Sequence, residues 1–188
     1  MKVFRLRLLS AVSLTALLGL AACGGDSQPD AAKASDPLQF CPPVAVLQQA
    51  QTVTLFLPGR SDIAAQISTA QITGISGQCT YRKKGKTPLL EVKFTASFLA
   101  ANGPANHGQP VTLPWFVAIT KGDQILDKKE YSIKLGFDGN MSKTAAVSKP
   151  VVIDLPPSPA SARLQILAGF EMTPEQLAYA AAHPGAAP

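Results

Sequence analysis

Strict alternation of apolar and polar residues constrains this chain more than any other feature of its sequence. The clearest stretch is residues 90–98, in which every second residue is apolar: Leu90, Val92, Phe94, Ala96 and Phe98. A period of two places one face of a β-strand in a core and the other face in water, whereas a helix would need apolar residues three and four apart. The stretch therefore predicts a half-buried strand.

The same alternation returns at residues 131–137 and 164–170, while residues 113–120 are apolar on both faces, as in a central strand. Further strands are expected at 52–57, 64–75, 78–82 and 145–155, and hairpin turns at 121–124 and 138–140. Seven or eight short strands of this kind predict an all-β fold, an antiparallel β-sandwich of the immunoglobulin or fibronectin type III kind. A small barrel is the alternative.

One short helix is expected at the carboxyl end. Thr173 is a suitable N-cap, Pro174 suits the first helical position, and Gln176 completes a variant of the capping box. Leu177, Ala180 and Ala181 would form a narrow apolar stripe that docks on the sandwich beside the last strand. We expect the sandwich domain with this helix to span residues 40–182, followed by a disordered tail, 183–188.

The amino end has the pattern of a secretory signal peptide. Lys2, Arg5 and Arg7 precede an apolar run at 8–20, and small residues lead to Cys23. This run is too short for a spanning helix, so residues 1–22 are expected to be removed. Removal takes away three of the seventeen Lys and Arg and none of the twelve Asp and Glu, and the formal charge falls from +5 to +2. Net charge therefore gives no support to nucleic-acid binding.

The residues Leu20-Ala21-Ala22-Cys23 resemble the lipobox of bacterial lipoproteins. This resemblance implies that Cys23 receives fatty acyl chains, palmitate among them, and becomes the new amino terminus, which would anchor the chain in a membrane. Gly24 follows where an Asp would signal retention in the inner membrane. The expected location is therefore the periplasmic face of the outer membrane, with the cell surface as the alternative. Residues 23–39, rich in small and polar residues, are expected to be the acylated Cys and a flexible tether.

Two cysteines remain once Cys23 carries lipid. Cys41 and Cys79 would lie in a compartment that permits disulfides, and we expect them to be paired. A catalytic thiol is the alternative, and it would need a His nearby in the fold.

No motif for catalysis, metal binding or phosphate binding occurs in the sequence. His107 stands in a Gly/Pro/Asn loop and is expected to be solvated. Asp123 with Asp127, and Asp138 with Asn140, have too few ligands for a calcium loop and are interpreted as hairpin turns. Gly74-Ile75-Ser76-Gly77 is interpreted as a turn before Cys79. We therefore expect no catalytic residue, metal or cofactor.

A basic cluster survives removal of the signal peptide: Arg82, Lys83, Lys84 and Lys86, with Gly85 at the tip of an expected hairpin. These cations could contact anionic lipid headgroups, lipopolysaccharide phosphates or an acidic partner. The alternative is a solvated tip that opposes edge-to-edge aggregation.

The remaining sequence, including Phe40-Cys41-Pro42-Pro43 and Pro114-Trp115-Phe116, resembles small uncharacterised outer-membrane lipoproteins of alphaproteobacteria, and this resemblance implies no activity. The chain is expected to be a lipid-anchored periplasmic protein that is not an enzyme and that binds an envelope protein, the cell wall or lipopolysaccharide. The alternatives are a periplasmic hydrolase with a site assembled from dispersed residues, and a purely structural envelope protein. A bare sheet edge or apolar patch would favour binding, whereas polar groups in a deep cleft would favour hydrolysis.

Overall fold

A computed structural model of the protein describes residues 36–138 and 141–188. The predicted signal peptide, the predicted acylation site Cys23 and most of the predicted tether lie outside the described residues, as do Gly139 and Asn140. Residues 35–188 form one compact unit. Its elements, in chain order, are η1 (Pro37–Phe40), β1 (Val44–Val46), η2 (Gln48–Ala50), β2 (Thr52–Phe56), η3 (Ile63–Ala65), β3 (Gln66–Lys84), β4 (Thr87–Asn102), β5 (Val111–Lys121), β6 (Gln124–Leu135), β7 (Lys143–Val147), β8 (Val151–Leu155), η4 (Ser161–Arg163), β9 (Gln165–Phe170) and α1 (Pro174–Ala182).

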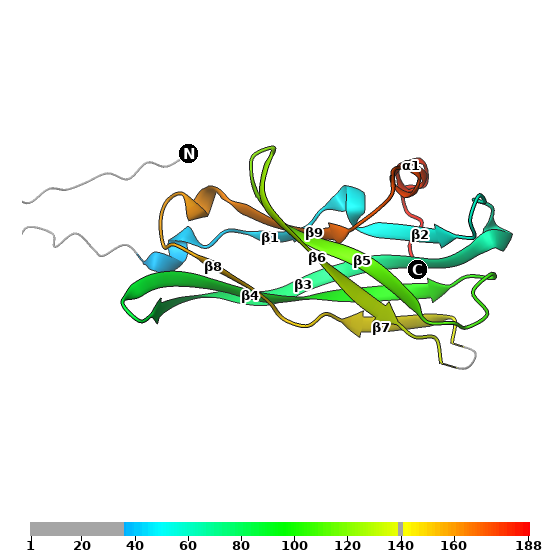
Figure 1. Ribbon diagram of the computed structural model, residues 1–188, viewed down its shortest axis with the longest axis horizontal. Coiled ribbons are helices and arrows are strands. Elements are labelled where there is room, and N and C mark those ends of the chain that lie inside the picture. The colour runs from blue at the N-terminus through cyan, green and yellow to red at the C-terminus, as the bar shows by residue number, and fades with distance from the viewer. Residues whose placement is uncertain (1–35, 139–140) are drawn as a thin grey trace, which may run out of the picture. The chain divides into compact units, whose positions relative to one another are not determined.

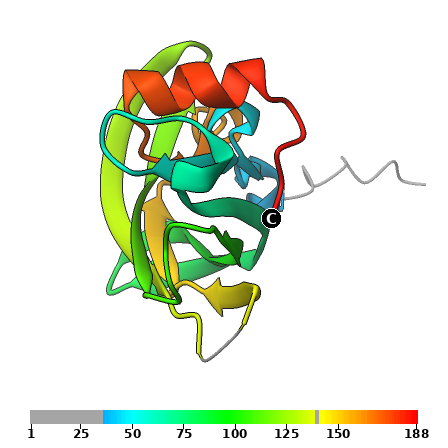
Figure 2. The same cartoon turned by 90° about the vertical axis from the view of Figure 1, so that its right-hand side faces the viewer.

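The strands of this unit form two sheets (Figure 1). The first sheet has the order β1-β9-β5-β6, and the second has the order β2-β3-β4-β7, with β8 also paired to β4. β5 lies between β9 and β6, which confirms the central strand predicted at 113–120. Figure 2 shows α1 outside both sheets.

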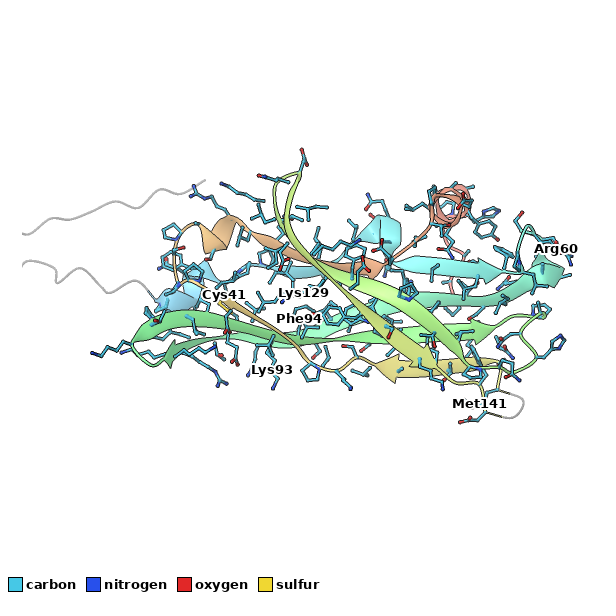
Figure 3. All side chains as sticks on the ribbon, in the orientation of Figure 1. Cys41, Arg60, Lys93, Phe94, Lys129 and Met141 are labelled. Carbon is cyan, nitrogen blue, oxygen red and sulfur yellow. A yellow bond between two sulfur atoms is a disulfide. The ribbon has the colours of Figure 1, made fainter. Side chains whose placement is uncertain are left out.

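The core lies between the two sheets and is built from the alternating residues. Phe94, Phe98, Trp115 and Phe170 are the largest fully buried side chains. Trp115 meets Phe98 edge to face with ring centroids 5.4 Å apart, and it stacks on Tyr131 at 4.9 Å. Lys93, beside Phe94 in sequence, is exposed on the other face of β4 (Figure 3). Full burial of such an apolar side chain stabilises a fold by roughly 1.5–3 kcal/mol, so these alternating positions hold the sheets together.

The all-β sandwich with one short C-terminal helix is thus confirmed. One strand pair departs from the antiparallel prediction, because β1 and β9 run parallel. The connectivity also differs from the ABED and CFG sheets of an immunoglobulin domain, since the consecutive strands β2, β3 and β4 are neighbours in one sheet. The finer immunoglobulin or fibronectin assignment is therefore not supported by the sheet order.

The predicted turn at Gly74–Gly77 is wrong, because both glycines lie inside the 19-residue strand β3. A register shift between Ile72 and Gly74 marks an irregularity there. At Gly77 the partner strand comes so close that an added Cβ would lie 2.3 Å from the carbonyl oxygen of Lys93. The glycine serves close approach of two strands, not a reversal of the chain.

The strand predicted at 145–155 is divided into β7 and β8. Ser148 follows the last residue of β7, and its Oγ accepts a hydrogen bond from the backbone N–H of Ala96 at 3.0 Å. Pro150 has no N–H to donate to a sheet, so a break at this point is the expected consequence.

The C-terminal helix is confirmed, with a complete capping box. Thr173 Oγ1 accepts from the N–H of Gln176, and the Gln176 side chain accepts from the N–H of Thr173. Its predicted docking face is wrong. Leu177 is 42% exposed, and α1 packs on β2 through Tyr179, whose ring meets Phe56 edge to face at 4.9 Å. The predicted stripe does not form the contact, because the ring of Tyr179 buries more apolar surface against β2 than the small alanine side chains could.

Candidate functional site

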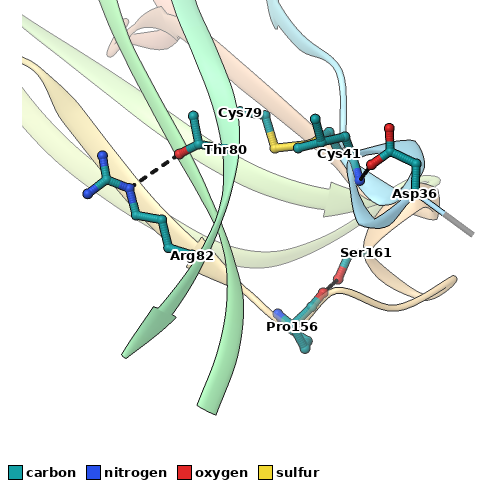
Figure 4. The surroundings of a disulfide bond; sticks show 8 residues. Asp36, Cys41, Cys79, Thr80, Arg82, Pro156 and Ser161 are labelled. Atoms are coloured by element: carbon teal, nitrogen blue, oxygen red, sulfur yellow. Dashed lines mark hydrogen bonds between the residues drawn. A yellow bond between two sulfur atoms is a disulfide. The ribbon is translucent and has the colours of Figure 1, made fainter. Parts of the chain in front are cut away.

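A disulfide joins Cys41 to Cys79, as predicted, with their Cα atoms 6.2 Å apart (Figure 4). It fastens the start of the folded unit to the second half of β3. Directly before Cys41, η1 is capped by Asp36, whose Oδ1 accepts a hydrogen bond from the N–H of Leu38 at 3.0 Å. Residues 37–40 therefore belong to the folded unit, so the tether predicted to reach residue 39 ends earlier. The disulfide fixes the point at which the chain enters the domain.

The basic cluster lies at the tip of the hairpin between β3 and β4. Gly85 has φ +64°, the left-handed conformation that a tight turn requires and that glycine adopts most readily. Arg82 pairs with Glu91 at 3.2 Å, while no ion pair joins Lys83, Lys84 or Lys86 to an acidic group among the described residues. The predicted hairpin position is confirmed, and three ammonium groups are exposed at its tip.

The chain entry and the basic tip lie at the same end of the unit (Figure 1). Cys79 stands five residues before Lys84 on one continuous strand, a distance of roughly 17 Å at about 3.4 Å per residue. A further cation, Arg163, ends η4, which contacts η1. Sequence inspection missed Arg163 because it stands about 80 residues from the hairpin, and only the fold brings η4 to η1.

A groove of about 580 Å³ runs between α1 and the outer face of β2 and β3. Its volume is within the range of roughly 300–1,000 Å³ that is typical of ligand sites. The floor is made by amide and hydroxyl side chains: Gln48, Gln49, Gln51, Thr52, Thr54 and Gln71. One wall is α1, and the tail residues 184–187, predicted to be disordered, line another side. No sequence motif indicated this groove, because its parts come from three separate segments.

Two hydrogen bonds hold part of the groove floor in place. Gln51 Nε2 donates to the carbonyl of Ile72 at 3.1 Å, and Thr54 Oγ1 is 3.2 Å from Thr69 Oγ1. In the α1 wall, Tyr179 stacks on His183 with ring centroids 4.1 Å apart and an interplanar angle of 19°. The His183 ring also hydrogen-bonds the carbonyl of Tyr179 through Nδ1 at 2.9 Å. The groove thus joins a neutral polar floor to an aromatic wall.

A second, smaller groove of about 360 Å³ opens between β6 and β8. Asp127 and Lys129 from β6 and Asp154 from β8 line it, together with apolar residues of β5. β6 is an edge strand, and its exposed start carries Ile125 and Leu126. Because Asp127 lines this groove from within β6, it is not part of the hairpin turn, contrary to the prediction. Of Asp123 and Asp127, only Asp123 lies in the turn.

The remaining predicted polar residues are not gathered into a site. His107 is exposed, has φ +51° and lies in the loop between β4 and β5, where Asn106 bonds Asn102 and the carbonyl of Gln109. No group of three or more His, Cys, Asp or Glu side chains is placed to hold a metal ion within the described ranges.

Comparison with known proteins found no match: no family model, no curated protein and no solved structure resembles the chain significantly. Within residues 36–138 and 141–188, no helix has the length and apolar character needed to cross a membrane.

Proposed function

We propose that the chain is a membrane-anchored periplasmic lipoprotein of the outer membrane that acts as a non-enzymatic binding module. Acylated Cys23 would anchor it, and residues 24–35 would form the tether. In this role the basic end of the folded unit faces the anionic membrane surface, and the opposite parts of the sandwich are presented to the periplasm.

The observation that supports this proposal best is the position of the Cys41–Cys79 disulfide. It holds the end of the tether beside the β3–β4 hairpin, so an anchor upstream of Asp36 would bring the exposed lysines to the membrane. Each Lys or Arg near an anionic membrane surface contributes about 1 kcal/mol of attraction. Lys83, Lys84 and Lys86 together would orient the domain, although they would bind only weakly without the lipid.

The exposed apolar residues and the free edge of β6 also favour a binding role. Ile125 is 61% exposed and Leu126 is 49% exposed, and β6 has a partner strand on one side within the first sheet. An uncovered edge with apolar side chains is a typical site for a protein partner. An envelope protein is the partner class that this edge would suit.

Vesicle binding tests the proposed orientation. The unit 35–188 contains the whole core and the disulfide, so it can be studied without the anchor. We expect it to bind vesicles that contain anionic phospholipid, and to lose this binding as salt shortens the Debye length from roughly 30 Å at 0.01 M to roughly 8 Å at 0.15 M. The double variant Lys83→Glu/Lys84→Glu should not bind.

A matched control makes the same two Lys→Glu substitutions at a place away from the hairpin. Lys134→Glu/Lys143→Glu alters two exposed lysines on β6 and β7, and Lys143 pairs with the end of β4 opposite to the hairpin. This variant should bind vesicles far better than the hairpin variant. Equal loss in both variants, or binding that does not respond to salt, would refute the orientation.

The anchor itself is tested by mass spectrometry of the membrane fraction. Cys23→Ser should leave an unprocessed precursor without acyl chains, because in the proposed pathway the thiol must be acylated before cleavage. The unchanged chain should begin at Cys23 and carry the mass of its acyl groups. A mature amino terminus at Cys23 without added acyl mass would contradict the lipoprotein assignment.

A further inference from the structure

We propose that the groove beneath α1 binds a neutral glycan chain. This inference goes beyond the proposed membrane anchoring, since a glycan site on β2, β3 and α1 does not depend on whether the basic hairpin contacts lipid. Three features of the groove support it: the chemistry of its floor, the aromatic wall, and floor side chains that form no hydrogen bond to another described residue.

The floor matches the hydrogen-bonding character of a sugar. Amide side chains carry two donors and an acceptor, and hydroxyl side chains donate and accept. Sugar hydroxyls likewise donate and accept, so either partner can supply the donor or the acceptor of a hydrogen bond. The floor side chains are all of these two types: Gln48, Gln49, Gln51, Thr52, Thr54 and Gln71.

Several of these groups are available to a ligand. Gln51 and Thr54 are used within the fold, as described above. Gln48, Gln49, Thr52 and Gln71 make no side-chain hydrogen bond to another described residue. Thr52 and Gln71 are direct cross-strand partners on β2 and β3, so their side chains lie next to each other on the outer face. Two adjacent strands therefore present two neighbouring polar side chains from an ordered backbone.

The α1 wall supplies the apolar surface that a pyranose ring needs. The stacked rings of Tyr179 and His183 line the groove together with the polar floor, and Leu177 and Ala178 extend the wall. Aromatic side chains combine a large apolar body with a polar end, which suits a ligand that has apolar C–H faces and polar edges. Phe56 holds the Tyr179 ring through an edge-to-face contact, so this part of the wall is formed without a ligand.

Other ligand classes fit less well. The residues that line the groove include no Lys, Arg, Asp or Glu. A phosphate or carboxylate would therefore lack the permanent counter-charge of a Lys or Arg side chain, and a cation would lack a carboxylate side chain. A purely apolar ligand would remove water from the free amide and hydroxyl groups without replacing their hydrogen bonds, which is unfavourable. A neutral polyhydroxyl ligand avoids both costs.

Isothermal titration of unit 35–188 with the tetrasaccharide of N-acetylglucosamine tests the inference. We expect saturable binding, and binding at least about tenfold weaker for Thr52→Val/Gln71→Leu, because this variant keeps the volume of the groove but removes two hydrogen-bonding side chains. The anionic tetrasaccharide of galacturonic acid should bind the unchanged protein at least about tenfold more weakly, for lack of a counter-charge.

The matched control makes the same two substitutions away from the groove. Thr112→Val/Gln165→Leu alters an exposed Thr and an exposed Gln in the first sheet, and it should bind the tetrasaccharide like the unchanged protein. Hydrogen exchange should show protection by the sugar at 48–54, 69–72 and 177–183. No binding of the neutral tetrasaccharide, equal weakening by the control variant, or protection elsewhere would overturn the inference. Binding of a neutral Gln- and Thr-rich peptide without binding of the sugar would also overturn it.

Discussion

Tyr179 meets Phe56 edge to face at 4.9 Å, and this contact fastens the C-terminal helix to the outer face of β2. The helix has no fully buried residue, and its predicted anchor, Leu177, is 42% exposed. An isolated helix of nine residues is marginal in water, so the docking of α1 depends largely on this aromatic pair. The groove beneath the helix depends on it as well.

Tyr179→Ala should release the helix while the sandwich stays folded. Hydrogen exchange should become faster at 174–182, and the core strands should keep their protection. Leu177→Asp is the matched comparison on the same helix, and as a surface change it should alter the free energy of unfolding by less than about 0.5 kcal/mol. The opposite result would contradict this prediction. If Leu177→Asp released α1 and Tyr179→Ala did not, the helix would be held through the face that carries Leu177.

Gly77→Ala should destabilise the domain, whereas Gly74→Ala should not. A Cβ at Gly77 would lie 2.3 Å from the Lys93 carbonyl oxygen and 2.4 Å from the Phe94 Cβ, while a Cβ at Gly74 would meet nothing within 4 Å. Chemical unfolding should show a loss of about 1–3 kcal/mol or more for Gly77→Ala, and no loss, or a gain of up to about 1 kcal/mol, for Gly74→Ala. Equal effects would mean that β4 does not approach Gly77 closely.

Removal of the disulfide should lower stability and loosen the chain entry. The bridge closes a sequence separation of 38 residues, for which chain entropy gives a loss of up to about 4 kcal/mol in Cys41→Ala/Cys79→Ala. Thermal unfolding measures the loss, and hydrogen exchange should become faster at η1. Thiol labelling of the folded, unreduced unit 35–188 should find no free cysteine. Two reactive thiols would contradict the bridge.

Lys128 should stabilise the first sheet at neutral pH but not at strongly alkaline pH. Its Nζ lies 2.5 Å from Glu171 Oε2 and 5.0 Å from the centre of the Phe116 ring. The hydrogen bond to Glu171 raises the pKa of Lys128 above its usual value. A raised pKa in the folded state means that the stabilisation is complete below the unfolded pKa of roughly 10.4 and is lost as pH rises through the folded pKa.

Chemical unfolding at pH 7 and about one unit above the unfolded lysine pKa measures this effect. Lys128→Met should reduce the difference in stability between the two pH values. The effect should stay below about 1 kcal/mol, because both side chains are about one-third exposed and solvent screens the pair. Lys129→Met, on the opposite face of β6, should leave the difference unchanged. A larger change in Lys129→Met would contradict the pairing.

Local patterns in the sequence predicted most of the strands and the C-terminal helix. Phe94 and Phe98 alternate with polar residues, and a period of two has the same meaning in any β-sheet. Thr173 and Gln176 form the capping box because both partners stand within one turn of chain. The pairing of Cys41 with Cys79 was predicted on the premise that the one other cysteine, Cys23, carries lipid, as its resemblance to a lipobox implies.

Contacts between distant segments were decided by the tertiary structure. Two glycines close together, such as Gly74 and Gly77, are typical of a turn. In the structure Gly77 lies in a strand, where residues 93 and 94 of β4 come too close for a side chain. The groove brings together Gln48, Gln71 and Tyr179. More than 100 residues of chain separate Gln48 from Tyr179, and no local pattern relates the three. Strand pairing and helix docking bring such groups together. Both are driven by the burial of surface between distant segments, and the amount of surface buried cannot be read from the order of the residues.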